Sequence, residues 1–287
     1  MISTDCDEHI IEAIGRCRVV IRNGEVVEVG EPQITDCPLA KRFAVPVKDF
    51  SKDAIKANIE HRIKAFGMCT PRRDVLATED FVGFGASEIL SCAMRSHLVD
   101  AAVLASDGAG TVVVTTPAMI QGIGGRMSGL VSTTPIKEVM DRIESKGGFV
   151  LDHQTAKLDQ PAGVRLAEKK GFRNIAVTVA GAESAEIIRR EHPGAIIFVV
   201  HTSGLTEDEA RRIAGTADLV TGCASKTVRS IIGPKALLQA GAAIPIFALT
   251  VRGKELVARR IVETTAPIFL KSSKLPVLGD DQPGPLI

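Results

Sequence analysis

Side chains able to bind an anion or to transfer a proton gather where apolar runs end in the second half of the chain. Thr221-Gly222-Cys223-Ala224-Ser225-Lys226 lies between a predicted strand and a predicted helix. Backbone N–H groups at such a turn favour an anion or a thiolate, and Ser225 and Lys226 add a hydroxyl and an ammonium group. His201 follows another apolar run and is a candidate for proton transfer. The alternative is a structural strand–helix turn with a buried Cys223 and a capping Ser225, and a hydrogen-bonded structural His201.

A glycine-rich stretch forms a second candidate site. Asp107-Gly108-Ala109-Gly110-Thr111 follows an apolar run, and four more glycines occur in residues 121–129. Glycine costs backbone entropy, so this density predicts a sharp turn or a close approach of the main chain to a ligand, a cluster or another backbone segment. A dinucleotide fingerprint does not fit, because the segment after the glycines is strand-like, and neither a P-loop nor a GxSxG elbow occurs. We predict as ligand-binding residues Arg72, Gly108, Gly110, Gly124, Arg126, Ser225 and Lys226, and as catalytic residues Asp107, His201 and Cys223.

The six cysteines contain no CxxC pair, so a zinc ribbon or ferredoxin spacing is absent. Cys37, Cys69 and Cys223 fall in predicted loops beside Gly or Pro. They are candidate ligands of an iron–sulfur cluster or another metal, with Cys17 or Cys92 as a fourth ligand. Apart from this metal hypothesis, the residues identify no cofactor.

The order of elements predicts an α/β fold with a mostly parallel sheet and helices on both faces, because apolar runs alternate with amphipathic segments after residue 147. Two β-rich runs around Asn23-Gly24 predict a small N-terminal hairpin. Helices are expected over residues 7–15 and, after the N-cap Ser51, as far as Gly67. Residues 268–270 are a predicted strand. The expected division is an N-terminal α+β half (1–147) and a C-terminal βα-repeating half (148–287), unless both form one integrated domain.

Composition excludes several classes of partner. The formal net charge is +1, and Trp and Tyr are absent, so neither nucleic-acid attraction nor a base-stacking platform is expected. No apolar stretch reaches the roughly 20 residues that span a bilayer. Residues 1–8 are polar and acidic, without the features of an export signal. We therefore expect a cytoplasmic protein without a membrane or nucleic-acid partner.

Several distinctive segments are distributed along nearly the whole chain. They include Asp7-Glu8-His9-Ile10-Ile11, Val29-Gly30-Glu31-Pro32, Phe66-Gly67-Met68-Cys69-Thr70-Pro71, Gln121-Gly122-Ile123-Gly124-Gly125-Arg126, Cys223-Ala224-Ser225-Lys226 and Pro245-Ile246-Phe247-Ala248. Together they resemble the methanogenesis marker protein 8 family of methanogenic archaea. A second, local likeness begins at Gly85-Ala86-Ser87 and is similar to the deazaflavin-hydrogenase beta-subunit family, without its ferredoxin-type cysteines.

Three functions remain open. The resemblance implies an accessory factor of methanogenesis that assists assembly or activation of a methane-forming enzyme or its cofactor, with proteins of methane metabolism as partners. Such a role would use a thiol- or metal-bearing site. The residues themselves suggest a metabolic enzyme acting on a small phosphate- or carboxylate-bearing substrate, with Asp107, His201, Ser225 and Lys226 in its pocket. The third alternative is an interaction scaffold without a small-molecule site.

Overall fold

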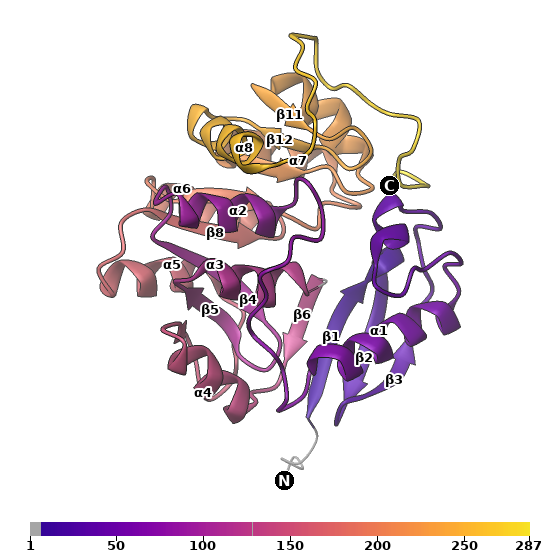
Figure 1. The fold of residues 1–287 in the computed structure, drawn as a ribbon, viewed down its shortest axis with the longest axis vertical. Helices are drawn as coiled ribbons and strands as arrows, with labels where there is room; N and C mark the ends of the chain where they lie inside the picture. Colours follow the sequence, from indigo (N-terminus) through magenta and orange to yellow (C-terminus); the bar gives the residue numbers. More distant parts are fainter. Residues whose placement is uncertain (1–6, 128) are drawn as a thin grey trace.

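Two β-sheets organise the chain in the computed structural model, which describes residues 7–127 and 129–287 (Figure 1). The first sheet is antiparallel, with strand order β3–β2–β1–β6. The predicted hairpin at Asn23-Gly24 is confirmed, because both residues have the positive φ that a tight two-residue turn requires. The strands are β1 (Glu8–Ala13), β2 (Cys17–Arg22), β3 (Glu25–Val29) and β6 (Gly129–Thr133).

Strand β1 occupies the place where the sequence predicted a helix over residues 7–15, so that prediction is wrong. His9, Ile11 and Ala13 are buried and the residues between them are less so. This is the period of two that a half-buried strand requires. Both edges of β1 are hydrogen-bonded, one to β2 and one to β6. The second neighbour, β6, lies more than a hundred residues further along the chain, so no short-range sequence pattern predicts this pairing.

Helix α1 (Lys52–Phe66) covers one face of this sheet through Ile55, Ile59 and Ile63. Both of its predicted ends are confirmed. The Ser51 hydroxyl accepts a hydrogen bond from the Ala54 amide at 3.3 Å, and Gly67 ends the helix with φ +73°. The first sheet and α1 thus enclose a small core of their own.

The second sheet has eight strands in the order β11–β12–β10–β9–β8–β4–β5–β7. Its four central strands, β10, β9, β8 and β4, are parallel, and antiparallel strands flank them on both sides. The predicted α/β class with a mostly parallel sheet is confirmed for this central part. Strands β4 and β5 come from residues before 147 and the others from residues after it. The strands are β4 (Ala101–Ser106), β5 (Gly110–Val114), β7 (Phe149–Val150), β8 (Ile175–Val179), β9 (Ile196–Val199), β10 (Leu219–Thr221), β11 (Leu238–Ala240) and β12 (Ile246–Ala248).

Helices cover both faces of the eight-stranded sheet, as predicted. Successive residues of one strand belong to opposite cores, for example Val103 and Leu104 in β4. One core is closed by α2 (Ala86–Arg95), α4 (Lys137–Ser145) and α8 (Val251–Glu263), and the other by α5 (Gln160–Lys169), α6 (Ala182–Glu191) and α7 (Glu207–Thr216). The short segments are η1 (Ile14–Arg16), η2 (Pro38–Arg42), α3 (Pro117–Met119), the π-helices η3 (Ile120–Gly125) and η4 (Val228–Ile232), and η5 (Gly233–Lys235).

The chain after α8 contains no strand at residues 268–270, so that prediction is wrong. Phe269 is 85% exposed, and a strand there would lack a covering layer for its apolar side chains. The tail then returns to the first sheet, where Gly284 forms an isolated antiparallel bridge with Asp36 (Figure 1). No helix among the described residues is long and apolar enough to cross a membrane.

The turn between β4 and β5 generates a stability prediction. Gly110 has φ +68°, and a Cβ there would lie 2.1 Å from the carbonyl oxygen of Ala156. We expect Gly110→Ala to lower the free energy of unfolding by about 3 kcal/mol or more, because both backbone strain and a main-chain collision result. Gly171 also has positive φ but faces open space, so Gly171→Ala is the control, with a loss of about 1 to 2 kcal/mol. Urea denaturation measures both variants, and equal losses would contradict the predicted collision.

Candidate functional site

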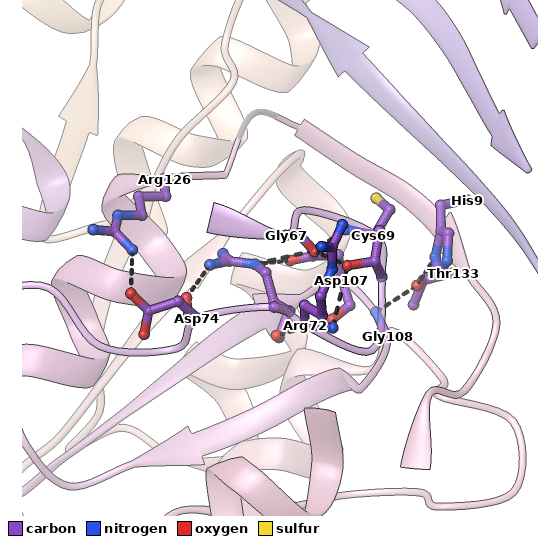
Figure 2. Close-up of polar contacts among 12 residues, drawn as sticks. His9, Gly67, Cys69, Arg72, Asp74, Asp107, Gly108, Arg126 and Thr133 are labelled. Atoms are coloured by element: carbon purple, nitrogen blue, oxygen red, sulfur yellow. Dashed lines mark hydrogen bonds and ion pairs between the residues drawn. The ribbon is translucent and has the colours of Figure 1, made fainter. Parts of the chain in front are cut away.

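Asp107 lies in the turn that joins β4 to β5, with its side chain fully buried (Figure 2). Its Oδ2 accepts a hydrogen bond from the Cys69 amide at 2.6 Å. The Nε of Arg73, equally buried, donates to Oδ1 at 2.9 Å and to Oδ2 at 3.1 Å. Asp107 therefore fixes the loop after α1 onto the end of β4. Its carboxylate oxygens are engaged within the protein, which is the arrangement of a structural ion pair.

The two glycines beside Asp107 confirm the predicted close approach, but the neighbour is the protein's own chain. A Cβ at Gly108 would lie 3.0 Å from the side chain of Ile136, and one at Gly110 would meet the Ala156 carbonyl. The Gly108 carbonyl also accepts a hydrogen bond from the Ile136 amide at 2.8 Å. The space that a ligand would need at either glycine is thus filled by other segments of the fold.

A buried relay connects this turn to the first sheet (Figure 2). The Gly108 amide donates to Thr133 Oγ1 at 2.8 Å, and that hydroxyl lies 2.5 Å from His9 Nδ1. His9 Nε2 lies 2.6 Å from Asp7 Oδ1. Burial disfavours the charged form of Asp7, but hydrogen bonds from His9 and Thr134 outweigh it and lower the pKa of this carboxyl. The relay was not predicted from the sequence, because His9 lies in the segment for which a helix was expected.

The predicted arginines lie on the other side of Asp107. Arg126 forms an ion pair with Asp74 at 3.0 Å and stacks over the ring of Phe66 (Figure 2). Arg72 is exposed and borders a surface groove of about 360 Å³ next to α1, together with Lys56 and Lys64. Arg72 adjoins Arg73, the ion-pair partner of Asp107, but the groove that Arg72 borders is lined by neither Arg126 nor Asp107.

His201 belongs to a different neighbourhood. A Cβ at Gly129, the first residue of β6, would lie 3.6 Å from His201 Nδ1. Thr133, which contacts the Asp107 turn, is the last residue of the same strand. Four residues of strand span about 13 Å, so His201 and the Asp107 turn lie near opposite ends of β6. The structure does not bring the predicted catalytic residues into a single site.

Polar side chains and backbone groups contact one another in the turn after β10. Ser225 Oγ accepts a hydrogen bond from the Val228 amide at 3.2 Å, which confirms Ser225 as a cap. Cys223 is half-buried with φ +37°, and its Sγ lies 3.3 Å from Thr221 Oγ1. The Ala224 amide donates to Ser203 Oγ at 3.1 Å. Hydroxyl groups from the loops after β9 and β10 therefore converge at the carboxyl edge of two parallel strands, where ligands bind in open α/β sheets.

Two backbone donors meet at this edge, and we call them the donor pair. The amide of Lys226 donates to the main-chain oxygen of Ile287 at 3.1 Å, and the amide of Gly204 donates to the same oxygen at 3.4 Å. The Ile287 amide in turn donates to the Ala224 carbonyl at 2.8 Å. An oxygen of the chain's own tail thus occupies the position that the sequence assigned to an anionic group.

Arg229 brings a positive charge to the turn that carries the Lys226 amide. This residue was not among the predicted site residues. The guanidinium is 4% exposed and donates at 2.9 Å to each of the carbonyl oxygens of Gly222 and Ser225. Its Nε donates to Gln282 Oε1 at 2.8 Å. Within residues 7–127 and 129–287, no carboxylate forms an ion pair with it. Burial lowers the pKa of Arg229 because the charged form is desolvated, and nearby Cys223 opposes that shift.

Of the three cysteines proposed as metal ligands, Cys69 lies apart, whereas Cys37 and Cys223 are neighbours: burial chiefly raises the pKa of the Cys37 thiol, and nearby Cys223 adds to this shift. Cys69 packs under α1 beside Asp107, and Cys37 packs against Ala40, Val47 and Phe50. Burial raises the pKa of the Cys69 thiol well above its usual value, and the Asp107 carboxylate adds to this effect. In the part of the chain that the structure describes, no group of three or more His, Cys, Asp or Glu residues is arranged to hold a metal ion. Cys17 and Cys92 are buried, and Cys6 lies outside the described residues.

The ion pair of Asp107 and Arg73 generates a second stability prediction. Asp107→Asn keeps the side-chain shape but leaves the buried guanidinium without its counter-charge, so we expect a loss of about 3 to 5 kcal/mol in the free energy of unfolding. Asp74 is 53% exposed in its ion pair with Arg126, and Asp74→Asn should cost about 1 kcal/mol or less. Chemical denaturation of both variants measures the difference. Similar losses would show that burial does not set the strength of these two pairs.

The family model described as "Uncharacterized protein conserved in archaea (DUF2099)" matches residues 9–262. An uncharacterized protein of Methanocaldococcus jannaschii is 43% identical over 284 residues, which cover 98% of this chain and 100% of the relative. The designation as marker protein 8 and the local likeness to the deazaflavin-hydrogenase family stay predictions. Because the family model covers most of its length, the chain belongs to this family of conserved archaeal proteins.

Proposed function

We propose that the protein binds a small carboxylate- or phosphate-bearing metabolite at the donor pair, the backbone amides of Gly204 and Lys226. The observation that supports this proposal is their convergence on a single oxygen, that of Ile287. They come from loops that follow adjacent parallel strands, β9 and β10. Two backbone N–H donors that converge on one point bind an anionic oxygen more strongly than a neutral one, so a carboxylate or phosphate is a suitable occupant of this position.

Charge around the donor pair favours the same class of ligand. Arg229 supplies a buried positive charge that donates hydrogen bonds to neutral oxygens, the side-chain oxygen of Gln282 and the carbonyl oxygens of Gly222, Ser225 and Ala243. Lys226 carries an exposed ammonium group on the same turn. Ser203 and the half-buried Cys223 add a hydroxyl and a thiol that can orient the remainder of the ligand. Asp107 has no part in this site, which differs from the single pocket that the sequence suggested.

The tail competes with the ligand in this arrangement. Ile287 is held by main-chain hydrogen bonds, whereas Gly284 is held separately through its bridge to Asp36. Removal of residues 285–287 therefore frees the donor pair and leaves that bridge in place. Binding of inorganic phosphate by the truncated protein should be about tenfold tighter than by the full chain, because no internal oxygen must be displaced. Isothermal titration calorimetry measures both affinities.

Lys226 allows the amide to be tested apart from the ammonium group. It is the first helical residue after the cap Ser225, a position where proline is tolerated although it lacks an N–H. In the truncated protein, Lys226→Pro should lower phosphate affinity by about tenfold or more, since a charge-assisted hydrogen bond is lost. Lys226→Gln removes only the side-chain charge, so a loss of about threefold or less is expected. A truncated protein that binds neither phosphate nor a small carboxylate would exclude this function.

The second candidate is an accessory role in methane metabolism, with proteins of that pathway as partners. The relative from Methanocaldococcus jannaschii, which aligns over its full length, is the observation that favours it. The proposed metabolite site would then serve as the sensor or substrate site of the accessory factor. Deletion of the gene from a methane-producing host should lower methane formation, and wild-type protein but not Lys226→Pro should restore it. Unchanged methane formation in the deletion strain would rule out this role.

A further inference from the structure

A cavity of about 250 Å³ opens beside the first turns of α8, and we call it the α8 cavity. Its lining residues are His97, Leu98, Asn174, Arg252, Glu255 and Leu256. Asn174 directly precedes β8, so the cavity lies at the amino ends of the parallel strands, whereas the donor pair follows their carboxyl ends. Sites for drug-sized ligands usually measure roughly 300 to 1,000 Å³, so the α8 cavity has room for a small molecule only.

The turn after α2 forms one wall of the cavity, and α8 holds it in place. The two helices pack against each other (Figure 1). Arg95 forms an ion pair with Glu263 at 2.7 Å, and Arg259 Nε donates to Ser96 Oγ at 2.6 Å. His97 follows with φ +58°, the left-handed conformation in which a helix commonly ends on glycine. Packing within the protein therefore preorganises this wall of the cavity.

Arg252 brings a positive charge that no carboxylate of the described residues neutralises by an ion pair. The guanidinium is half-buried, and it donates to the Gly194 carbonyl and to Asn174 Oδ1, the latter at 3.4 Å. Asn174 is itself fixed, because its Nδ2 donates to Asp100 Oδ2 at 3.2 Å. A guanidinium has more N–H donors than these two contacts use, so Arg252 keeps donors for an anionic group in the cavity.

Glu255 brings a negative charge to the same cavity. It follows Arg252 by three positions on α8, a spacing at which side chains are neighbours on a helix surface. The two do not form an ion pair with each other, and no Lys, Arg or His within residues 7–127 and 129–287 forms one with Glu255. Leu256 is 1% exposed and Leu98 is 37% exposed, so apolar side chains adjoin both charges. A cationic group, an anionic group and an apolar wall thus share one small cavity.

We infer that the α8 cavity binds a free α-amino acid with an apolar side chain. Such a molecule carries a carboxylate for Arg252 and an ammonium group for Glu255, and its side chain can contact the two leucines of the cavity. A simple anion would be opposed by Glu255 and a simple cation by Arg252, so the two charges favour a zwitterion over either. The residue at a peptide end lacks one of the two charged groups and can pair with only one of these side chains. This site shares no residue with the donor pair and does not depend on the function proposed above.

The free amino acid L-leucine is the probe for this site, and two derivatives that each lack one charge are the controls. The amide of leucine has no carboxylate, and N-acetyl-leucine has no ammonium group. In the full chain, NMR titration with leucine should give saturable shifts of the backbone amides of Leu98 and Leu256. Each derivative should bind about fivefold more weakly or worse, since one charged contact is lost. Absence of saturable shifts with leucine, or equal affinity for leucine and either derivative, would overturn the proposal.

Adjacent residues of α8 provide a matched pair of variants. Glu255→Gln removes the negative charge from the cavity and should weaken leucine binding by about fivefold. The same variant should bind N-acetyl-leucine at least as tightly as the wild-type protein does, because it no longer repels this anion. Lys254 is exposed and does not line the cavity, so Lys254→Gln should change leucine affinity by about twofold or less. Circular dichroism checks that both variants are folded, and equal leucine affinities for the two would refute the assigned role of Glu255.

Discussion

The buried ion pair between Asp107 and Arg73 is the interaction on which the junction of the two sheets depends. Removing both charges from water is expensive, and that cost is opposed by their mutual attraction and by further hydrogen bonds, from the Cys69 amide to the carboxylate and from the guanidinium to the Asp74 carbonyl. The pair ties the loop after α1 to the turn after β4. The neighbouring relay through Thr133 and His9 then joins that turn to β1. Strands β6 and β1 are thus held to the end of β4, β2 follows through its pairing with β1, and β3 through its pairing with β2.

Local signals predicted much of the fold. A few consecutive residues determine each of three local features: the Asn23-Gly24 turn, the Ser51 cap and the end of α1 at Gly67. The strands of the second half have continuous apolar sequences because they are buried on both faces. Strand β1 could not be recognised in the same way. Its identity depends on pairing with β6, and β6 is a short segment with exposed residues in its centre.

The candidate sites could be predicted from the sequence only in part. The glycines at 108 and 110 indicated a close approach, but residue type does not reveal whether the neighbour is a ligand or the Ala156 carbonyl. The turn after β10 was recognisable from its polar residues at a strand end. Arg229 and the Ile287 oxygen were not, since one lies in an irregular helix and the other arrives from the far end of the chain. Long-range contacts carry the information that decides between structural and functional interpretations.

The pairing of β1 with β6 also constrains the order in which the chain can fold. Residues 8–13 find their second neighbour only after residues 129–133 have been made, and β4 must wait for β8 at residues 175–179. Contacts so distant in sequence slow folding, because a long loop must close before the strands can pair. As the chain leaves the ribosome, the hairpin of β2 and β3 can form early, while β1 keeps an open edge. That edge is an exposed template for pairing with other chains until β6 covers it.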